Sequence, residues 1–169
     1  MPGKTIYLAS PLGFAASTQG FMHELVRAMR DVIVVVNPWD DQRFAGEFTH
    51  LRDEDSVSAR DSRLAEINAK LGRKNAESID LADGVFAILD GVDVDSGTAA
   101  EIGYAFAKGK YVCGMRTDFR LAGDNHGSIV NLQVQYFIER SGGQIVTGVD
   151  EFVALARAFN RVPPCPAPG

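Results

Sequence analysis

"GVFAILDGVDVDSGTAAEIGYAFAKGKYVCGMR", residues 84–116, carries the clearest folding signal in the chain. An aliphatic run at 84–90 leads into a turn with three aspartates, and a series of small apolar residues then ends at Gly109. A second aliphatic run follows at 110–116. The pattern predicts a strand, a helix over 98–108 and a further strand, which is the repeating unit of parallel sheets.

The same alternation extends in both directions along the chain. Apolar runs predict three more strands, and helical spacing of apolar residues predicts helices on either side of them. The strands are expected at 5–10, 31–38 and 143–148, and the helices at 18–30, 58–82 (one or two, interrupted near Gly72), 129–140 and 149–161. We therefore expect an α/β fold, a doubly wound parallel five-stranded sheet with helices on both faces. Ligands of such sheets bind beyond the carboxyl ends of the strands.

Length and composition are those of one folded unit. The 169 residues are 46% hydrophobic and 23% charged, so we expect a single domain over 1–162 and a flexible proline-rich tail over 163–169. Residues 39–57 are polar and irregular with embedded aromatics, which predicts a functional loop or lid. A net charge of -5 argues against nucleic acid as a partner.

No apolar run in the sequence is long enough to cross a bilayer, and the start lacks the apolar core of a signal peptide. We therefore expect a cytoplasmic protein with no membrane partner. The two cysteines suggest no disulfide framework, and Cys113 is expected in the core. The three histidines show no metal-ligand spacing, so we expect no metal and no cofactor.

The turn at 90–98 has a purely structural interpretation. Thr98 and Glu101 have the spacing of a capping box, in which the Thr98 hydroxyl and the Glu101 carboxylate would satisfy backbone N–H groups at the start of the helix. Negative charge is favoured near a helix N-terminus, so the aspartates could be ordinary loop residues.

A catalytic interpretation uses the position of the turn. It follows a central buried strand, so Glu101, in the first turn of its helix, would lie at the edge of the ligand crevice with Asp95 six residues earlier. Two carboxyl groups beside a small organic substrate are the working parts of glycosidic bond cleavage, one as nucleophile and one handling protons. Spacing does not separate the two interpretations.

Asn75 lies on the apolar stripe of the helix expected over 58–82, four residues after Leu71 and four before Ile79. It should therefore face inward, where an amide needs hydrogen-bond partners. It either satisfies nearby backbone or orients a catalytic carboxylate.

The block from Asp95 to Ala105, DSGTAAEIGYA, resembles the nucleoside 2-deoxyribosyltransferases. The likeness extends to TIYLASP at the start, to WDDQRF in the long loop and to Asn131-Leu132, and it covers most of residues 5–135. The resemblance implies a flavodoxin-like sheet and exchange of the base of a 2'-deoxyribonucleoside by double displacement. Free purine or pyrimidine bases would be the second substrates.

The resemblance also implies roles for individual residues. Glu101 matches the nucleophile that attacks C1' of the sugar, Asp95 an aspartate that contacts the sugar and helps manage protons, and Tyr7 a tyrosine that holds the nucleophile. Gln42 matches a loop residue that contacts the base. Asn131 matches an asparagine that neighbouring subunits lend to each other's sites, which implies a homo-oligomer.

Further substrate contacts are expected from Phe14, in the loop after the first strand, and from Asp93 and Gly97 in the aspartate-rich turn. Asn75 is a departure, because some members of the family have an aspartate there that is a candidate for protonating the departing base. An amide donates no acidic proton. Either another acid takes that role, or base exchange is restricted to particular bases.

Two other functions compete with base exchange. A hydrolase would split 2'-deoxynucleoside 5'-monophosphates with the same nucleophile, but it needs a phosphate cradle, and the loop from Ser10 to Thr18 is largely apolar. A non-catalytic nucleotide-binding module fits less well, because the carboxylates of Asp93, Asp95 and Glu101 would repel phosphate.

Overall fold

The structure is a computed structural model that describes residues 3–41 and 56–161. Its centre is a sheet in which all neighbouring strands are parallel, in the order β2-β1-β3-β4-β5. The strands are β1 (Thr5–Ala9), β2 (Val34–Val36), β3 (Gly84–Ile88), β4 (Tyr111–Met115) and β5 (Ile145–Val146). This strand order confirms the predicted α/β fold and its flavodoxin-like topology.

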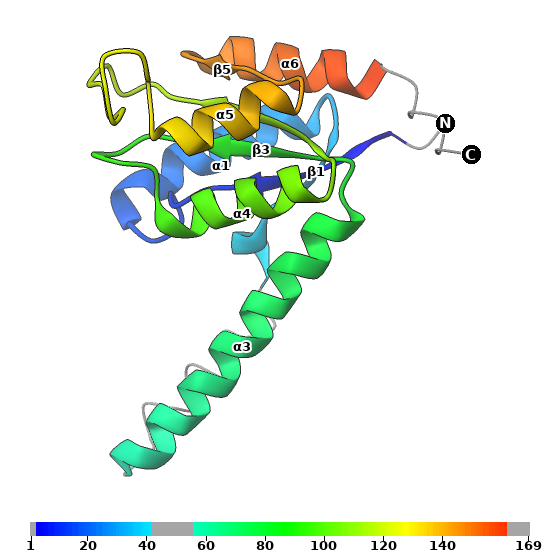
Figure 1. Ribbon diagram of the computed structural model, residues 1–169. Helices are drawn as coiled ribbons and strands as arrows, with labels where there is room; N and C mark the ends of the chain where they lie inside the picture. The colour runs from blue at the N-terminus through cyan, green and yellow to red at the C-terminus, as the bar shows by residue number, and fades with distance from the viewer. Residues whose placement is uncertain (1–2, 42–55, 162–169) are drawn as a thin grey trace.

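Helices cover both faces of the sheet (Figure 1). One layer contains α1 (Ala16–Arg30) and α6 (Val149–Arg161), and the other contains α4 (Ser96–Ala107), α5 (Leu132–Arg140) and the last turns of α3 (Val57–Leu81). A short 3-10 helix, η1 (Pro38–Asp40), follows β2.

Alternation along the strands divides the interior into two cores. In β1, Ile6 and Leu8 pack with α1 and α6, whereas Tyr7 and Ala9 face the α3–α4–α5 layer. Successive side chains of a strand point to opposite faces, so the register of β1 determines which side receives the Tyr7 ring. Tyr7 consequently lies on the same face of the sheet as Glu101.

Several predicted boundaries differ from the structure, among them those of α3, β2 and α4. α3 is one continuous helix through Gly72, which has open space around it; one glycine costs a helix only about 1 kcal/mol relative to alanine. β2 is shorter than predicted because the chain leaving α1 stays coiled, and the Ile33 N–H donates to the Met29 carbonyl. α4 begins at Ser96, two residues before the predicted start at Thr98.

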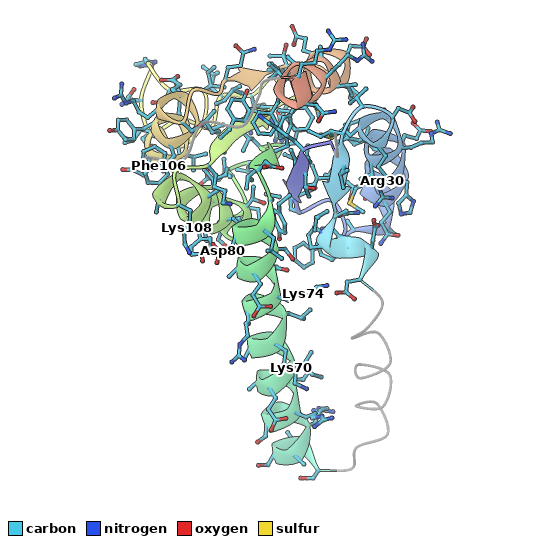
Figure 2. The ribbon with its side chains drawn as sticks, turned by 90° about the vertical axis from the view of Figure 1, so that its right-hand side faces the viewer. Arg30, Lys70, Lys74, Asp80, Phe106 and Lys108 are labelled. Carbon is cyan, nitrogen blue, oxygen red and sulfur yellow. The ribbon has the colours of Figure 1, made fainter. Side chains whose placement is uncertain are left out.

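The C-terminal end of α3 is fixed to the body of the protein, while the rest of the helix projects away from it (Figure 1). Asp80 accepts a hydrogen bond from Tyr104 and pairs with Lys108 at 2.8 Å, and the Lys110 ammonium donates to the Asp80 and Ala82 carbonyls (Figure 2). Nearer the middle, Lys74 forms an ion pair with Asp41. These contacts fix the position of α3 along its own axis. They thereby determine where Asn75, the residue after Lys74, lies relative to the edge of the sheet.

No helix within residues 3–41 and 56–161 is both long and apolar enough to cross a membrane. The same residues contain no group of three or more histidine, cysteine, aspartate or glutamate side chains that could hold a metal ion.

Candidate active site

A crevice is expected where β1 and β3 lie side by side, because the helices that follow them cover opposite faces of the sheet. Ligands of doubly wound folds bind at this change of direction, outside the carboxyl ends of the strands. Tyr7 comes from β1 and Glu101 from the second turn of α4, the helix that follows β3. Because α4 starts two residues earlier than predicted, Glu101 lies in the second turn of its helix and not in the first.

Tyr7 and Glu101 are joined directly. The Tyr7 hydroxyl donates a 2.5 Å hydrogen bond to Oε1 of Glu101, although 94 residues separate them in sequence. The Tyr7 ring is fully buried. Burial, the Glu101 charge and the hydrogen bond all raise the pKa of Tyr7, so the phenol keeps its proton and acts as a donor.

The Glu101 carboxyl is poised between its two protonation states near neutral pH. Its pKa is raised from 4.5 to about 7, chiefly by burial; the Tyr7 hydrogen bond lowers the pKa, and the Asp95 charge contributes to the rise. Within the described residues, only Tyr7 and Asn75 donate to this carboxylate, and both reach Oε1. Oε2 accepts no hydrogen bond from residues 3–41 or 56–161.

Asn75 faces inward from α3, as its position on the apolar stripe predicts. Its Nδ2 lies 3.5 Å from Oε1 of Glu101, which is a long hydrogen bond. Of the two interpretations of this amide, the structure favours the contact with the carboxylate.

Asp95, not Thr98, caps α4, so the predicted capping box is wrong. Oδ1 of Asp95 accepts the Thr98 backbone N–H at 3.0 Å and the Thr98 hydroxyl at 3.3 Å. Thr98 is buried inside the first turn, and Glu101 is bonded to Tyr7 instead of to the start of its own helix. Capping uses one oxygen of Asp95, and no described residue donates to the other.

The aspartate-rich turn is organised around the buried side chain of Val94. Asp93 and Asp95 flank it, and Asp93 is exposed while Asp95 is partly buried. Oδ1 of Asp93 accepts the Val94 N–H at 2.7 Å. A Cβ at Gly97 would lie 3.1 Å from Oδ1 of Asp95, so glycine leaves the space beside this carboxylate open.

Phe14 is 77% exposed in the loop after β1, where its ring meets the edge of Trp39 with centroids 4.6 Å apart. The Trp39 indole N–H donates to the Ser10 carbonyl at 2.8 Å, and its ring lies where a Gly13 side chain would be. Trp39 therefore packs against the loop that presents Phe14 and holds it in place.

Asn131 caps α5, and its Oδ1 accepts the Gln133 and Val134 N–H groups. Its Nδ2 points to Asp124 at 3.5 Å, so the structure does not join Asn131 to Glu101 within this chain. Gln42, the predicted base contact, lies outside the described residues. The structure therefore brings together Tyr7, Asn75 and Glu101, with Asp95 near enough for its charge to act on Glu101.

One residue whose position the sequence left open is Arg116. It is 3% exposed at the carboxyl end of β4, whereas Arg120 forms a surface ion pair with Asp118. A cation that directly follows a buried strand was the available signal, but sequence spacing does not distinguish a buried guanidinium from an exposed one.

Comparison with known proteins identifies the family. The family model for nucleoside 2-deoxyribosyltransferase matches residues 6–133. The chain belongs to the nucleoside 2-deoxyribosyltransferase family. This match confirms the resemblance expected from the Asp95–Ala105 block. Among curated proteins, none matches the chain at a significant level.

Solved structures of similar fold include two deoxyribosyltransferases. The chain is 22% identical to 2-deoxyribosyltransferase from Bacillus psychrosaccharolyticus, with a TM-score of 0.67 over 95% of this chain and 98% of that one. It is 22% identical to the Leishmania mexicana enzyme, with a TM-score of 0.63 over 92% and 97%. CMP N-glycosidase from Clostridium botulinum is 17% identical, with a TM-score of 0.50 over 90% and 97%. These likenesses show that the chain shares the fold of these proteins.

Proposed function

We propose that this protein exchanges the base of 2'-deoxyribonucleosides, with Glu101 as the nucleophile. The observation that carries the proposal is the buried Glu101 carboxylate, held through Oε1 by Tyr7, while no residue in the described part of the chain donates to Oε2. A carboxylate so placed at the expected ligand crevice can approach the anomeric carbon. Membership of the family supports the same chemistry.

In the first step, Oε2 of Glu101 forms a bond to C1' as the C1'–N bond to the base breaks. The base leaves with the bonding electron pair and takes up a proton. The transition state is oxocarbenium-like, so the nearby carboxylate charge stabilises it before trapping it as a covalent ester. In the second step, a nitrogen of an incoming base attacks C1', loses its proton and releases the Glu101 carboxylate. Two inversions give net retention.

The remaining residues are assigned around this centre. Tyr7 holds Glu101 through Oε1 and preserves the lone pairs of Oε2 for attack. Asp95 binds the sugar and manages the proton of the base through its oxygen that does not cap α4. Asn75 supports the position of Glu101, and since its amide is not an acid, protonation of the leaving base falls to Asp95 or to solvent.

Asp93, Gly97, Phe14 and Gln42 complete the proposed site. Asp93 and Phe14 are exposed, so both are available to a substrate, and Gly97 leaves room beside Asp95. We assign Phe14 to the sugar side and keep Gln42 as a base contact.

A homo-oligomer with shared sites is part of the proposal. The surface of α5 carries Leu132 and Tyr136, each about half exposed at 49% and 50%, and Tyr136 adjoins Phe106 and Phe137 in an aromatic cluster. Burial of these side chains against a second copy would remove them from water. Asn131, at the start of the same helix, would then reach the neighbouring site.

Mixing two inactive variants tests the shared site. Glu101→Gln removes the nucleophile and Asn131→Ala removes the contribution to the neighbour, so subunit exchange between them creates sites that contain both native residues. We expect activity to recover on mixing. Activity that stays absent, or a monomer by analytical ultracentrifugation, would contradict the shared site.

A hydrolase acting on 2'-deoxynucleoside 5'-monophosphates is the second candidate. The observation in its favour is the start of α1, where no side chain caps the helix and no acidic residue occupies the first turn; free N–H groups at a helix start suit a phosphate. Against it, the Thr18 hydroxyl already donates to the Leu12 carbonyl.

One assay distinguishes the two functions. The protein is incubated with thymidine or deoxyinosine and free adenine, and new deoxyadenosine is followed by chromatography. A parallel reaction compares hydrolysis of deoxyinosine with that of its monophosphate. We expect deoxyadenosine to form. Release of sugar without it, with strong preference for the monophosphate, would establish the hydrolase instead.

A further inference from the structure

We infer that Arg116 is a positioning residue that, together with Asp90, fixes the loop of Asp93 and Asp95 to the loop that leads to Asn131. Neither Arg116 nor Asp90 is among the residues assigned to chemistry or substrate binding. The inference rests on the proposed function, because it concerns the placement of the same site.

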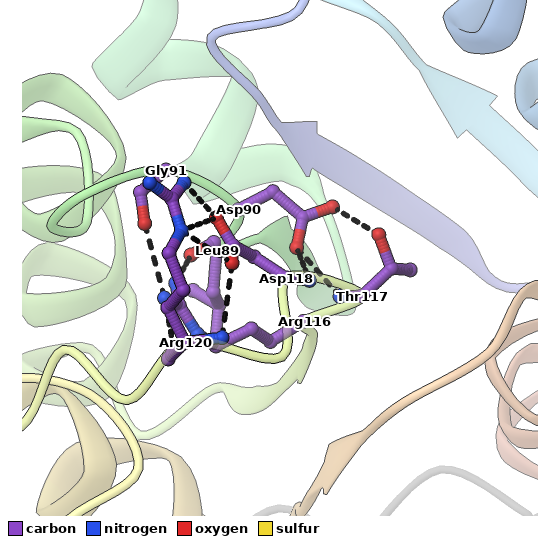
Figure 3. A network of polar contacts seen from close by, with 7 residues as sticks. All are labelled: Leu89, Asp90, Gly91, Arg116, Thr117, Asp118 and Arg120. Carbon is purple, nitrogen blue, oxygen red and sulfur yellow. Dashed lines mark hydrogen bonds and ion pairs between the residues drawn. The ribbon is translucent and has the colours of Figure 1, made fainter.

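The Arg116 guanidinium connects two loops that follow different strands (Figure 3). Nη1 donates to the Leu89 carbonyl, and Nη2 donates to the Gly91 carbonyl at 3.0 Å and to the Arg120 carbonyl at 2.7 Å. Leu89 and Gly91 belong to the loop between β3 and α4, whereas Arg120 belongs to the loop between β4 and α5. A single buried cation therefore holds both loops.

Asp90 makes the reciprocal connection. Its carboxylate comes from the loop after β3 and accepts the Thr117 N–H, the Thr117 hydroxyl at 2.8 Å and the Asp118 N–H at 2.8 Å, all from the loop after β4 (Figure 3). The two loops are thus cross-linked in both directions, by a cation on carbonyls and by an anion on donors. Charge-assisted bonds of this kind are about twice as strong as neutral ones.

The Arg116 bond to the Gly91 carbonyl lies where the loop of Asp93 and Asp95 changes direction. Gly91 has φ +137°, and a Cβ there would lie 2.9 Å from the Asp93 carbonyl, so the turn requires glycine. Because Arg116 holds the Gly91 carbonyl, it fixes the peptide that leads to Asp93 and Asp95. A displacement of about 1 Å in a catalytic group can cost roughly 10²-fold in rate.

The geometry requires arginine and not merely a positive charge. The three carbonyls accept from two different nitrogens of a planar fork, and the ammonium of lysine is a single point. Burying a cation is unfavourable unless its donors are satisfied. Both terminal nitrogens of the Arg116 guanidinium, which is 3% exposed, donate to carbonyls, whereas its Nε has no partner within the described residues. The bonds that join the two loops therefore offset part of the cost of burying this cation.

The test uses Arg116→Lys, with Arg120→Ala as the matched control. The control removes a surface guanidinium but keeps the carbonyl that Arg116 binds. We expect kcat for base exchange to fall about 10²-fold in R116K, with cooperative unfolding retained, and to change less than about twofold in R120A. Near-native kcat in R116K would overturn the inference, because charge would then suffice.

A second variant and a readout other than activity keep the test decisive. Asp90→Asn keeps one accepting oxygen, so we expect an intermediate loss of about 10-fold; this variant carries the kinetic test if R116K does not fold. Hydrogen exchange of the Thr117 and Asp118 amides should accelerate in R116K or D90N and stay unchanged in R120A.

Hydrogen exchange also distinguishes a failure of the proposed function from a failure of the inference about Arg116 and Asp90. If the native protein transfers no base, the proposed function fails, and faster exchange in R116K or D90N still supports the cross-link. Exchange at the native rate in both variants would refute it.

Discussion

The hydroxyl of Tyr7, in the middle of β1, donates a 2.5 Å hydrogen bond to Oε1 of Glu101 in the second turn of α4. Two residues 94 positions apart meet because β1 and β3 are neighbours and α4 packs on the face of the sheet that receives the Tyr7 ring. The bond occupies Oε1 of Glu101 and not Oε2. Glu101 is therefore held by Tyr7 instead of capping the start of its own helix, as a positioned nucleophile would be.

The pH profile of base exchange should report the ionisation of Glu101. Burial raises its pKa to about 7, and only the carboxylate attacks, so kcat/KM should rise with pH through an apparent pKa near 7. Asp95→Asn removes the repelling charge while keeping a capping side chain, so it should move this limb to lower pH. Tyr7→Phe removes a bond that favours the charged form, so it should move the limb to higher pH.

The opposite directions of these two shifts are the decisive feature. A limb that stays in place in both variants, or that moves the same way in both, would assign the ionisation to another group. Asp150→Asn, at an exposed position of α6, is the control and should leave the profile unchanged.

The contribution of Glu101 to the stability of the folded protein should fall with rising pH, whereas kcat/KM should rise. Glu101 has a higher pKa in the folded protein than in the unfolded chain, so its contribution is fully present below pH about 4.5 and is lost as pH rises through about 7. Glu101→Gln carries no charge to bury and still accepts the Tyr7 hydroxyl. At pH 8 it should therefore be more stable than the native protein by up to about 3 kcal/mol, as measured by denaturant unfolding.

The advantage should vanish at pH 4 to 5, where the native carboxyl is protonated in the folded state. An E101Q variant that is less stable than the native protein at pH 8 would mean that the buried charge is compensated by partners other than Tyr7 and Asn75.

The two donors to Glu101 should differ in importance. The 2.5 Å bond from Tyr7 is short and charge-assisted, whereas the contact from Asn75 is 3.5 Å long. Hydrogen bonds to charged groups contribute about 1.5–3 kcal/mol, so Tyr7→Phe should lower kcat about 10- to 100-fold and Asn75→Ala less than about 10-fold. Steady-state kinetics at pH 8.5 measures both, and a larger loss in N75A than in Y7F would reverse this ranking.

Gly13 should be sensitive to a single methyl group. A Cβ at this position would lie 2.0 Å from the Trp39 ring, so Gly13→Ala must displace Trp39 or the loop that presents Phe14. We expect lower stability and a raised KM for the nucleoside. Gly20→Ala is the matched control, since its Cβ meets nothing within 4 Å in α1, and it should stabilise by about 0.5–1 kcal/mol. A native KM in G13A would show that this loop does not contribute to binding of the nucleoside.

Periodicity was sufficient to predict the sheet and its layers. Strand runs such as 84–88 are continuous apolar segments, and Cys113 is buried in β4 as predicted. Helix boundaries were harder to predict from the sequence, because alternative capping residues differ little in the stability that they give a helix. Asp95 and Thr98 are both good N-caps, and the helix begins after the earlier one, which leaves Glu101 free to meet Tyr7.

Contacts between distant segments lay beyond the sequence pattern. Asn75 was predicted to face inward, but its partner depends on how far α3 reaches past the sheet, which the contacts of Asp80 and Lys110 determine. For Arg116 the available signal was its position directly after a buried strand. That signal did not suffice to predict burial, because no carboxylate at helical or strand spacing marks Arg116 and its partners are backbone carbonyls.

Trapping of the covalent intermediate tests the central claim most directly. A 2'-deoxy-2'-fluoro nucleoside slows the second displacement, and peptide mass spectrometry then locates the bound sugar. We predict one fluorodeoxyribosyl group per chain on the peptide that contains Glu101, and none in folded E101Q. A label on another residue, or base exchange that continues in E101Q, would contradict the assignment of Glu101 as the nucleophile.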